Sequence, residues 1–426
     1  MADLAVFIGD EVPRRSILPD RLVPLMPGIF GNERVESEKI RLANEGTPTA
    51  QVSVGVTFSK NTYVAENWLN PLRGYAYDCV NPDVLKEARV ENGDLILKSG
   101  ARYRALLVPD AHPMQPNPEA ISVQTKSTLE RLKRENLRQI ETPYLNEDFS
   151  KIGFERDFIV LENNVYAEEI VYNHRTDDKS DIYFISNQKD SKREVIISLR
   201  VKNKIPEIWN PVNGKIHEAE EWKVENGRTV LPLMLDAGES LFVVLRTETV
   251  NSVSQGRNWD EYKNIAEISN SWKVNFDTDN RGKHQELTMD SLILWNHFVE
   301  DSIRFFSGTA SYISTFNFNK KDTKNIYIEL EEIHNIATVK INGKNCGTIW
   351  TKPYRVDISD ALKQGRNTIE ITLTNTWANR IMGDELYNTD NNSADKIWTN
   401  ARYRTPLKQP VNSGLAGKVK VVEKLK

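Results

Sequence analysis

The sequence has 426 residues, of which 39% are hydrophobic and 27% charged, the composition of a globular protein with material for roughly two to four domains. Its net charge is −4 and it carries no basic stripe, so neither nucleic acid nor an anionic membrane is favoured as a partner. The two cysteines, Cys79 and Cys346, are far apart, which argues against a disulfide framework and against a thiolate metal site.

The first ten residues, MADLAVFIGD, lack a positive region and a long apolar run, so they do not resemble a signal peptide. They predict a buried strand that starts close to Met1, and a chain that opens on a strand is a hint of truncation. No segment approaches about 18 consecutive apolar residues, so no membrane span is expected.

Residues 1–160 mix the signals of strands and helices. Residues 4–8 and 103–108 are short apolar runs typical of buried parallel strands, and residues 118–138 predict a helix with an apolar stripe. The long polar stretch 14–82 predicts an insertion between the two strands. We therefore expect a small α/β domain with that insertion, of a flavodoxin-like or amidotransferase-like type.

Residues 165–248 consist almost wholly of strand and turn signals. The Asn-Gly pairs that begin at Asn213 and Asn226 mark hairpin turns between apolar runs, so this region predicts an antiparallel β-sandwich. Residues 249–267 follow, and their Ser, Thr and Asn content predicts a linker. The third predicted domain spans residues 268–426.

Strict alternation of apolar and polar residues marks the third domain. Residues 326–331 and 369–374 both show it, which predicts strands with one buried and one solvated face. In residues 339–357, VKINGKNCGTIWTKPYRVD, the Asn342-Gly343 pair separates two such runs and predicts a hairpin. The region therefore predicts an antiparallel sandwich or jelly roll.

Aromatic residues near the predicted turns of the third domain suggest a carbohydrate-binding surface. Aromatic rings stack on sugar faces, and a few directional polar groups fix the orientation of the sugar. The segment TNTWANRIMGDE after the strand 369–373 is expected to be a loop that carries such groups. The candidate contacts are Trp350, Tyr354, Arg355, Trp377, Asn379, Arg380, Asp384, Glu385 and Trp398. The alternative is that the tryptophans fill the sandwich core and the polar groups hold the loop.

The sequence gives little support to catalysis by this chain. It contains no nucleotide-binding motif, no nucleophile elbow and no His pair with zinc-ligand spacing. Glycoside hydrolysis usually needs two carboxylates about 5–10 Å apart. The candidates for such a pair are Glu300, Asp301, Asp384 and Glu385, but solvated loop charges are the more common explanation of such residues.

Two segments carry a family resemblance, IRFFSGTASYISTF (303–316) and residues 339–377, continued by NRIMGDE (379–385) and closed by SGLAGKVKV (413–421). Together they resemble the galactose-binding-like jelly roll of glycoside hydrolases, most closely the C-terminal domain of the family 106 α-L-rhamnosidases. ADLAVFIGDEVP (2–13) and further N-terminal segments resemble the regions that follow the catalytic barrel in those enzymes.

The resemblance implies a mainly β, multidomain chain with a small α/β N-terminal region, an antiparallel sandwich and a C-terminal galactose-binding-like jelly roll. It also implies a family that hydrolyses rhamnose-containing or related oligosaccharides and polysaccharides with a (β/α)₈ barrel. A barrel needs about 250 residues of repeating strand and helix, which this sequence does not supply. The family's catalytic glutamates have no matching positions, so no catalytic residue is assigned.

The same resemblance implies no cofactor in this chain, with calcium expected only in the full-length enzyme, and a periplasmic or secreted location for that enzyme. The partner would be the missing barrel domain. An exposed apolar patch around residues 1–13 and 103–108 would then mark the surface that the barrel leaves uncovered. Two alternatives stay open: a stand-alone carbohydrate-binding protein and a structural or assembly module.

Overall fold

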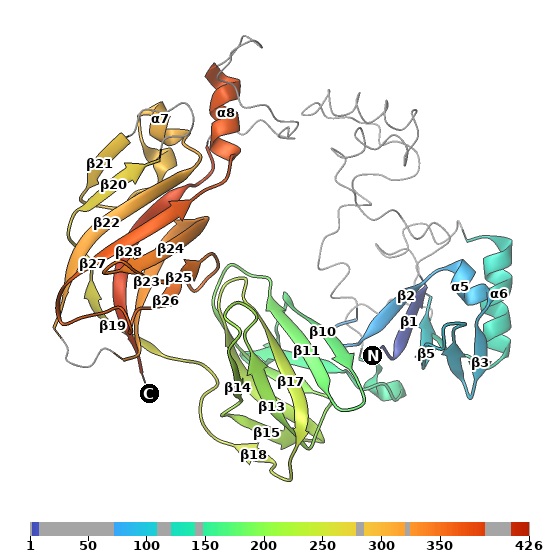
Figure 1. Cartoon of the computed structure of the whole chain (residues 1–426). Coiled ribbons are helices and arrows are strands. Elements are labelled where there is room, and N and C mark those ends of the chain that lie inside the picture. The colour runs from blue at the N-terminus through green and yellow to red at the C-terminus, as the bar shows by residue number, and fades with distance from the viewer. Residues whose placement is uncertain are drawn as a thin grey trace. The chain divides into compact units, whose positions relative to one another are not determined.

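The computed structural model describes residues 2–7, 72–108, 121–140, 148–277, 285–319, 324–387 and 410–425. These residues form two compact units, one that extends to Trp259 and one that begins at Asp260 (Figure 1). Strands dominate both units, and all but the first sheet are antiparallel, so the predicted mainly β fold class is confirmed.

A small parallel sheet opens the first unit, in the strand order β2-β1-β6-β7. Its strands are β1 (Leu4–Phe7), β2 (Tyr77–Val80), β6 (Ala105–Leu107) and β7 (Gln139–Ile140). Helices α5 (Pro82–Lys86) and α6 (Val123–Arg134) pack on one face through Leu85, Leu129 and Leu132. Alternate residues of β1 face Tyr75, Phe149 and Phe154 on the other side. A hairpin sheet of β3 (Arg89–Glu91), β4 (Asp94–Ile96) and β5 (Arg102–Tyr103) adjoins it.

The expected exposed patch on this sheet is absent, and that prediction is wrong for the described residues. All residues of β1 and β6 are 0% exposed, because the two helices cover one face and the aromatic residues cover the other. The predicted C-terminal boundary of the insertion 14–82 is wrong, since Tyr77–Val80 forms strand β2, which pairs with β1. Residues 14–71 lie outside the described part of the chain.

An antiparallel sandwich completes the first unit. One sheet has the order β10-β11-β17-β13-β14 and the other β18-β15-β16-β12-β8-β9. The strands are β8 (Phe158–Glu162), β9 (Val165–Tyr166), β10 (Ile170–Thr176), β11 (Asp181–Asn187), β12 (Arg193–Leu199), β13 (Lys204–Trp209), β14 (Ile216–Glu218), β15 (Trp222–Glu225), β16 (Arg228–Leu235), β17 (Ser240–Glu248) and β18 (Val253–Ser254). Their alternating apolar residues form one shared core.

The second unit is another antiparallel sandwich, with sheet orders β19-β28-β23-β26 and β21-β20-β22-β27-β24-β25. The strands are β19 (Tyr262–Glu267), β20 (Trp272–Phe276), β21 (Gln285–Met289), β22 (Thr309–Phe318), β23 (Ile326–His334), β24 (Ile336–Ile341), β25 (Lys344–Ile349), β26 (Arg355–Asp357), β27 (Gly365–Thr374) and β28 (Gly414–Lys424). Both sheets contribute to one core. Helices α7 (Asp301–Arg304) and α8 (Ala378–Tyr387) lie at one end of it (Figure 1).

The hairpin predicted at Asn342-Gly343 joins β24 to β25. Asn342 has φ +52° and Gly343 has φ +81°, the left-handed values that a tight turn of this hand requires at both positions. The stretch 249–267, expected to be a linker, contains β18, which pairs with β15, and β19, which pairs with β28. The three-domain division of the chain stays a prediction.

Candidate functional site

The register of the six-stranded sheet in the second unit brings two of the candidate tryptophans to one end. Ala337 of β24 lies opposite Ile349 at the end of β25, and Ile336 lies opposite Thr374 at the end of β27. The chain therefore leaves β25 and β27 at the same end of the sheet, and Trp350 and Trp377 follow these strand ends. With β24 between these strands, their ends are about 10 Å apart, two inter-strand spacings.

Both of these indole side chains are exposed to solvent. Trp350 is 58% exposed and Trp377 is 56% exposed, whereas Trp295 in the core of the same unit is fully buried. The alternative that these residues fill the core is therefore wrong for Trp350 and Trp377. Two large apolar rings left in water at one end of a sheet are suited to contact a ligand.

Tyr354 and Arg355 have contacts within the protein. The Arg355 guanidinium pairs with the Glu329 carboxylate on the neighbouring strand β23, and it lies 3.6 Å from the centroid of the Tyr262 ring. Tyr354 is half-buried against the core of the second unit. These contacts attach strand β26 to the sheet, so Arg355 stabilises the fold.

The segment that carries Asn379, Arg380 and Asp384 is helix α8, so the prediction of a loop is wrong. The Asn379 amide is 1% exposed and holds another segment of the chain: its Oδ1 accepts from the Val411 N–H at 2.8 Å, and its Nδ2 donates to the Val411 carbonyl at 2.8 Å and to Ser413 Oγ at 3.1 Å. Asn379 therefore joins α8 to the start of β28.

The charged residues of α8 pair with each other one helical turn apart. Arg380 Nε donates to Asp384 Oδ1 at 2.9 Å, and the backbone N–H of Arg380 donates to Ser307 Oγ at 3.1 Å. Asp384 is 7% exposed. Among the other carboxylates considered for hydrolysis, Asp301 lies 3.8 Å from Arg304. The side chain of Glu385 and the whole of Trp398 lie outside the described residues.

Loss of the Asn379 amide is expected to weaken the second unit. Asn379→Ala leaves the half-buried N–H and C=O of Val411 without these partners, which costs about 1–3 kcal/mol of stability. Urea unfolding measures the loss, and Asn317→Ala, at an exposed asparagine of β22, is the matched control. Equal midpoints for the two variants would contradict this role of Asn379.

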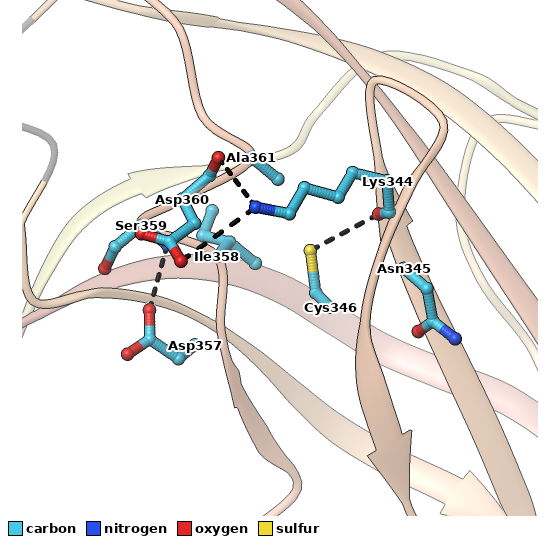
Figure 2. A pocket seen from close by; sticks show the side chains of 8 residues that line it. All are labelled: Lys344, Asn345, Cys346, Asp357, Ile358, Ser359, Asp360 and Ala361. Carbon is cyan, nitrogen blue, oxygen red and sulfur yellow. Dashed lines mark hydrogen bonds and ion pairs between the residues drawn. The ribbon is translucent and has the colours of Figure 1, made fainter.

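A polar hollow of about 300 Å³ lies at the opposite end of β25, near the hairpin turn (Figure 2). Its lining residues are Lys344, Asn345, Cys346, Asp357, Ile358, Ser359, Asp360 and Ala361. None of them is aromatic, and they bond to one another: the Lys344 ammonium donates to the Asp360 carbonyl at 3.2 Å, and Asp357 Oδ1 accepts from the Ser359 N–H at 2.9 Å. Burial raises the pKa of the Cys346 thiol, so it stays protonated near neutral pH. No motif in the sequence marks this hollow.

Within the described ranges, no cluster of three or more His, Cys, Asp or Glu side chains is placed to hold a metal ion. Cys79 and Cys346 are both free thiols. In the same part of the chain, no helix is long and apolar enough to cross a membrane.

Comparisons with known proteins cover most of the chain. Residues 119–223 match the family model described as alpha-L-rhamnosidase, and residues 257–405 match the model described as Glycosyl hydrolase 2 galactose-binding domain-like. A protein of Formosa agariphila named "Putative beta-glucuronidase" is 37% identical over 121 residues, which are 28% of this chain and 10% of that protein.

A solved structure of a rhamnosidase from Novosphingobium sp. PP1Y is similar over 99% of this chain, with a TM-score of 0.66 and 25% sequence identity. The chain spans 39% of the length of that rhamnosidase. The predicted family resemblance and the predicted galactose-binding-like domain are both confirmed. The chain is therefore similar to part of a glycoside hydrolase family 106 α-L-rhamnosidase, a part that includes a galactose-binding-like domain.

Proposed function

We propose that the chain is a non-catalytic part of an α-L-rhamnosidase-like glycoside hydrolase that acts in polysaccharide breakdown. It supports a (β/α)₈ catalytic domain and contributes contacts to a rhamnose-containing or related glycan. The observation that carries the proposal is the exposure of Trp350 and Trp377 at one end of the same sheet.

The chemistry of these two residues suits a glycan. The C–H faces of a sugar ring pack on a flat aromatic surface, and the indole N–H donates a hydrogen bond to a sugar hydroxyl. Trp350 directly follows β25, and Trp377 lies three residues past the end of β27, two strands away in the same sheet, so the two indoles can contact separate rings of one oligosaccharide. The ligand class is therefore an oligosaccharide or a segment of a polysaccharide.

The contacts of Asp301 and Asp384 favour a structural role of these two carboxylates over a catalytic one. Asp384 is paired with Arg380 and nearly buried, and Asp301 faces Arg304. Each carboxylate therefore lies against an arginine of its own helix, and both are engaged within the protein. Calcium is proposed only for the full-length enzyme.

A structural or assembly module is the second candidate, and the contacts that Arg355 and Asn379 make within the protein favour it. Calorimetric titration with a rhamnose-containing oligosaccharide distinguishes the two. Binding with a Kd of about millimolar or tighter supports glycan contacts, whereas no heat at that concentration supports the structural module alone. A stand-alone binding protein would bind equally well in the absence of a catalytic domain.

Turnover by this chain alone is expected to be absent. We expect no release of aryl alcohol from an aryl α-L-rhamnoside, because Asp301 and Asp384 each lie against an arginine of the same helix. The assay compares the chain alone with a full-length family enzyme as positive control. Turnover that disappears in Asp384→Asn would overturn the non-catalytic assignment.

A further inference from the structure

A cluster of buried charges lies within the first unit, centred on His174 of strand β10. The imidazole is placed between two carboxylates: Nδ1 is 2.9 Å from Asp157 Oδ2 and Nε2 is 3.3 Å from Asp181 Oδ1. The Tyr183 ring stacks on the imidazole at 3.9 Å, and its hydroxyl donates to Asp157 Oδ1 at 3.1 Å. His174 is 7% exposed and Asp157 is 1% exposed, so water screens these charges poorly.

The cluster extends from the sandwich to the parallel sheet. Arg200, which follows β12, lies 3.7 Å from Asp157 Oδ1, and its Nη2 donates to Asp3 Oδ2 at 2.5 Å. Asp3 directly precedes β1, an inner strand of the parallel sheet. On the other side, Lys204 of β13 donates to Asp181 Oδ2 at 2.9 Å. One chain of ionic contacts therefore runs from β1 through Asp157 and His174 into the sandwich.

The charges of these six contact residues balance when His174 is a cation. The carboxylates are Asp3, Asp157 and Asp181, and the fixed cations are Arg200 and Lys204. Three negative and two positive charges leave one negative charge uncompensated, and protonated His174 neutralises it. An unpaired charge in a buried site is costly, so the structure favours the protonated imidazole.

Arg228, Glu155 and Tyr172 also face the cluster. Arg228 of β16 donates to Ser198 Oγ at 2.8 Å and to the Asp157 carbonyl at 3.2 Å, and the exposed Glu155 faces Arg228 with the opposite charge. Tyr172 of β10 is a neutral phenol, and burial raises its pKa well above its ordinary value. Arg228 therefore bonds to neutral oxygens and not to a carboxylate of the cluster.

We propose that these ionic contacts form a proton-dependent link between the parallel sheet and the sandwich. The residues of the link, named the His174 cluster, are Asp3, Arg200, Asp157, His174, Asp181 and Lys204. With His174 protonated, Asp157 is neutralised by the imidazolium and Arg200 remains bonded to Asp3. Without the proton, the Asp157 carboxylate attracts Arg200, which is already 3.7 Å away, and the bond to Asp3 weakens. Deprotonation therefore loosens β1 from the sandwich.

The direction of the pH dependence follows from the contacts of the imidazole. Burial opposes its charged form, but hydrogen bonds to Asp157 and Asp181 outweigh burial and raise the pKa of His174. Since that pKa is higher in the folded state, the stabilisation is complete below the unfolded value of about 6.5 and is lost as pH rises through the folded pKa. The hydrogen bond from His174 lowers the pKa of Asp181 to about 2, so its contribution is present above about pH 4 and is lost as pH falls toward 2.

Hydrogen exchange of the whole chain, followed by mass spectrometry from about pH 6 to about pH 9, tests the proposal. After correction for the intrinsic exchange rate, we expect the protection of β1 and β6 to fall with rising pH relative to β12 and β16. His174→Gln should remove this dependence. His217→Gln, at an exposed histidine on β14, should retain it.

A second variant separates the contact from the folding of the sandwich, since His174→Gln can fail to fold. Asp3→Asn changes only the end of the cluster on the parallel sheet, and we expect low protection of β1 at every pH with the sandwich intact. NMR titration of His174 in the unmodified protein should give a pKa above 6.5, the ordinary value. A lower pKa, or protection of β1 that does not change with pH, would overturn the proposal.

Discussion

Replacement of Gly74 by alanine is expected to destabilise the first unit severely. Gly74 has φ +80°, and a Cβ at this position would lie 1.9 Å from the Phe158 carbonyl oxygen, a backbone atom that no side-chain rotation can move. The Gly74 carbonyl also accepts from the Phe158 N–H at 3.0 Å, so the clash breaks a bond between the parallel-sheet region and β8. Backbone strain and overpacking together cost about 3 kcal/mol or more, or about 6–12 °C in Tm.

Gly100→Ala is the matched control for this prediction. Gly100 has φ +89°, but nothing lies within 4 Å of its would-be Cβ, so this variant shows the backbone strain alone. We expect it to cost about 1 kcal/mol. Thermal unfolding measured by circular dichroism compares the two variants. If Gly74→Ala and Gly100→Ala lower the stability equally, the close approach of Gly74 to the Phe158 carbonyl adds nothing to the cost of the substitution.

Removal of the exposed indoles is expected to abolish glycan binding and leave the fold intact. Trp350→Ala and Trp377→Ala should each weaken binding of a rhamnose-containing oligosaccharide about tenfold, because a stacked aromatic ring contributes about 1.5 kcal/mol. The double variant should show no saturable binding. Because both side chains are more than half exposed, Tm should change little.

The control for the indole variants is Val212→Ala, which removes an exposed apolar side chain in the first unit. It should bind the oligosaccharide as the unmodified chain does. Affinity that is unchanged in the double tryptophan variant would remove the proposed glycan contacts at this end of the sheet. A large drop in Tm would show that the indoles serve the fold.

Local patterns predicted the sandwiches well, because each pattern has a local physical cause. The Asn342-Gly343 turn needs positive φ at two adjacent positions, which few residue types other than Asn and Gly adopt readily. Alternation along 369–374 reports one buried face of β27, whose Ile369 and Ile371 are 0% exposed. The apolar stripe in 118–138 likewise matches α6, although the helix itself spans Val123–Arg134.

Features that depend on distant partners could not be read from the sequence. Strand β2 contains Asp78 and Cys79, and only its pairing with β1 identifies it as a strand. Asn379 resembles a sugar ligand in isolation, and its burial follows from Val411, which is 32 residues away. The roles of Trp350 and Arg355 differ because the register leaves one past the end of β25 and places the other beside Glu329.

The most direct test of the proposed glycan contacts is an NMR titration that follows the indole N–H signals of the nine tryptophans. The signals of Trp350 and Trp377, assigned from their alanine variants, should shift together and saturate as a rhamnose-containing oligosaccharide is added. The signal of the buried Trp295 should stay in place. If neither exposed indole responds at roughly millimolar oligosaccharide, or if only tryptophans of the first unit respond, the glycan contacts proposed here do not exist.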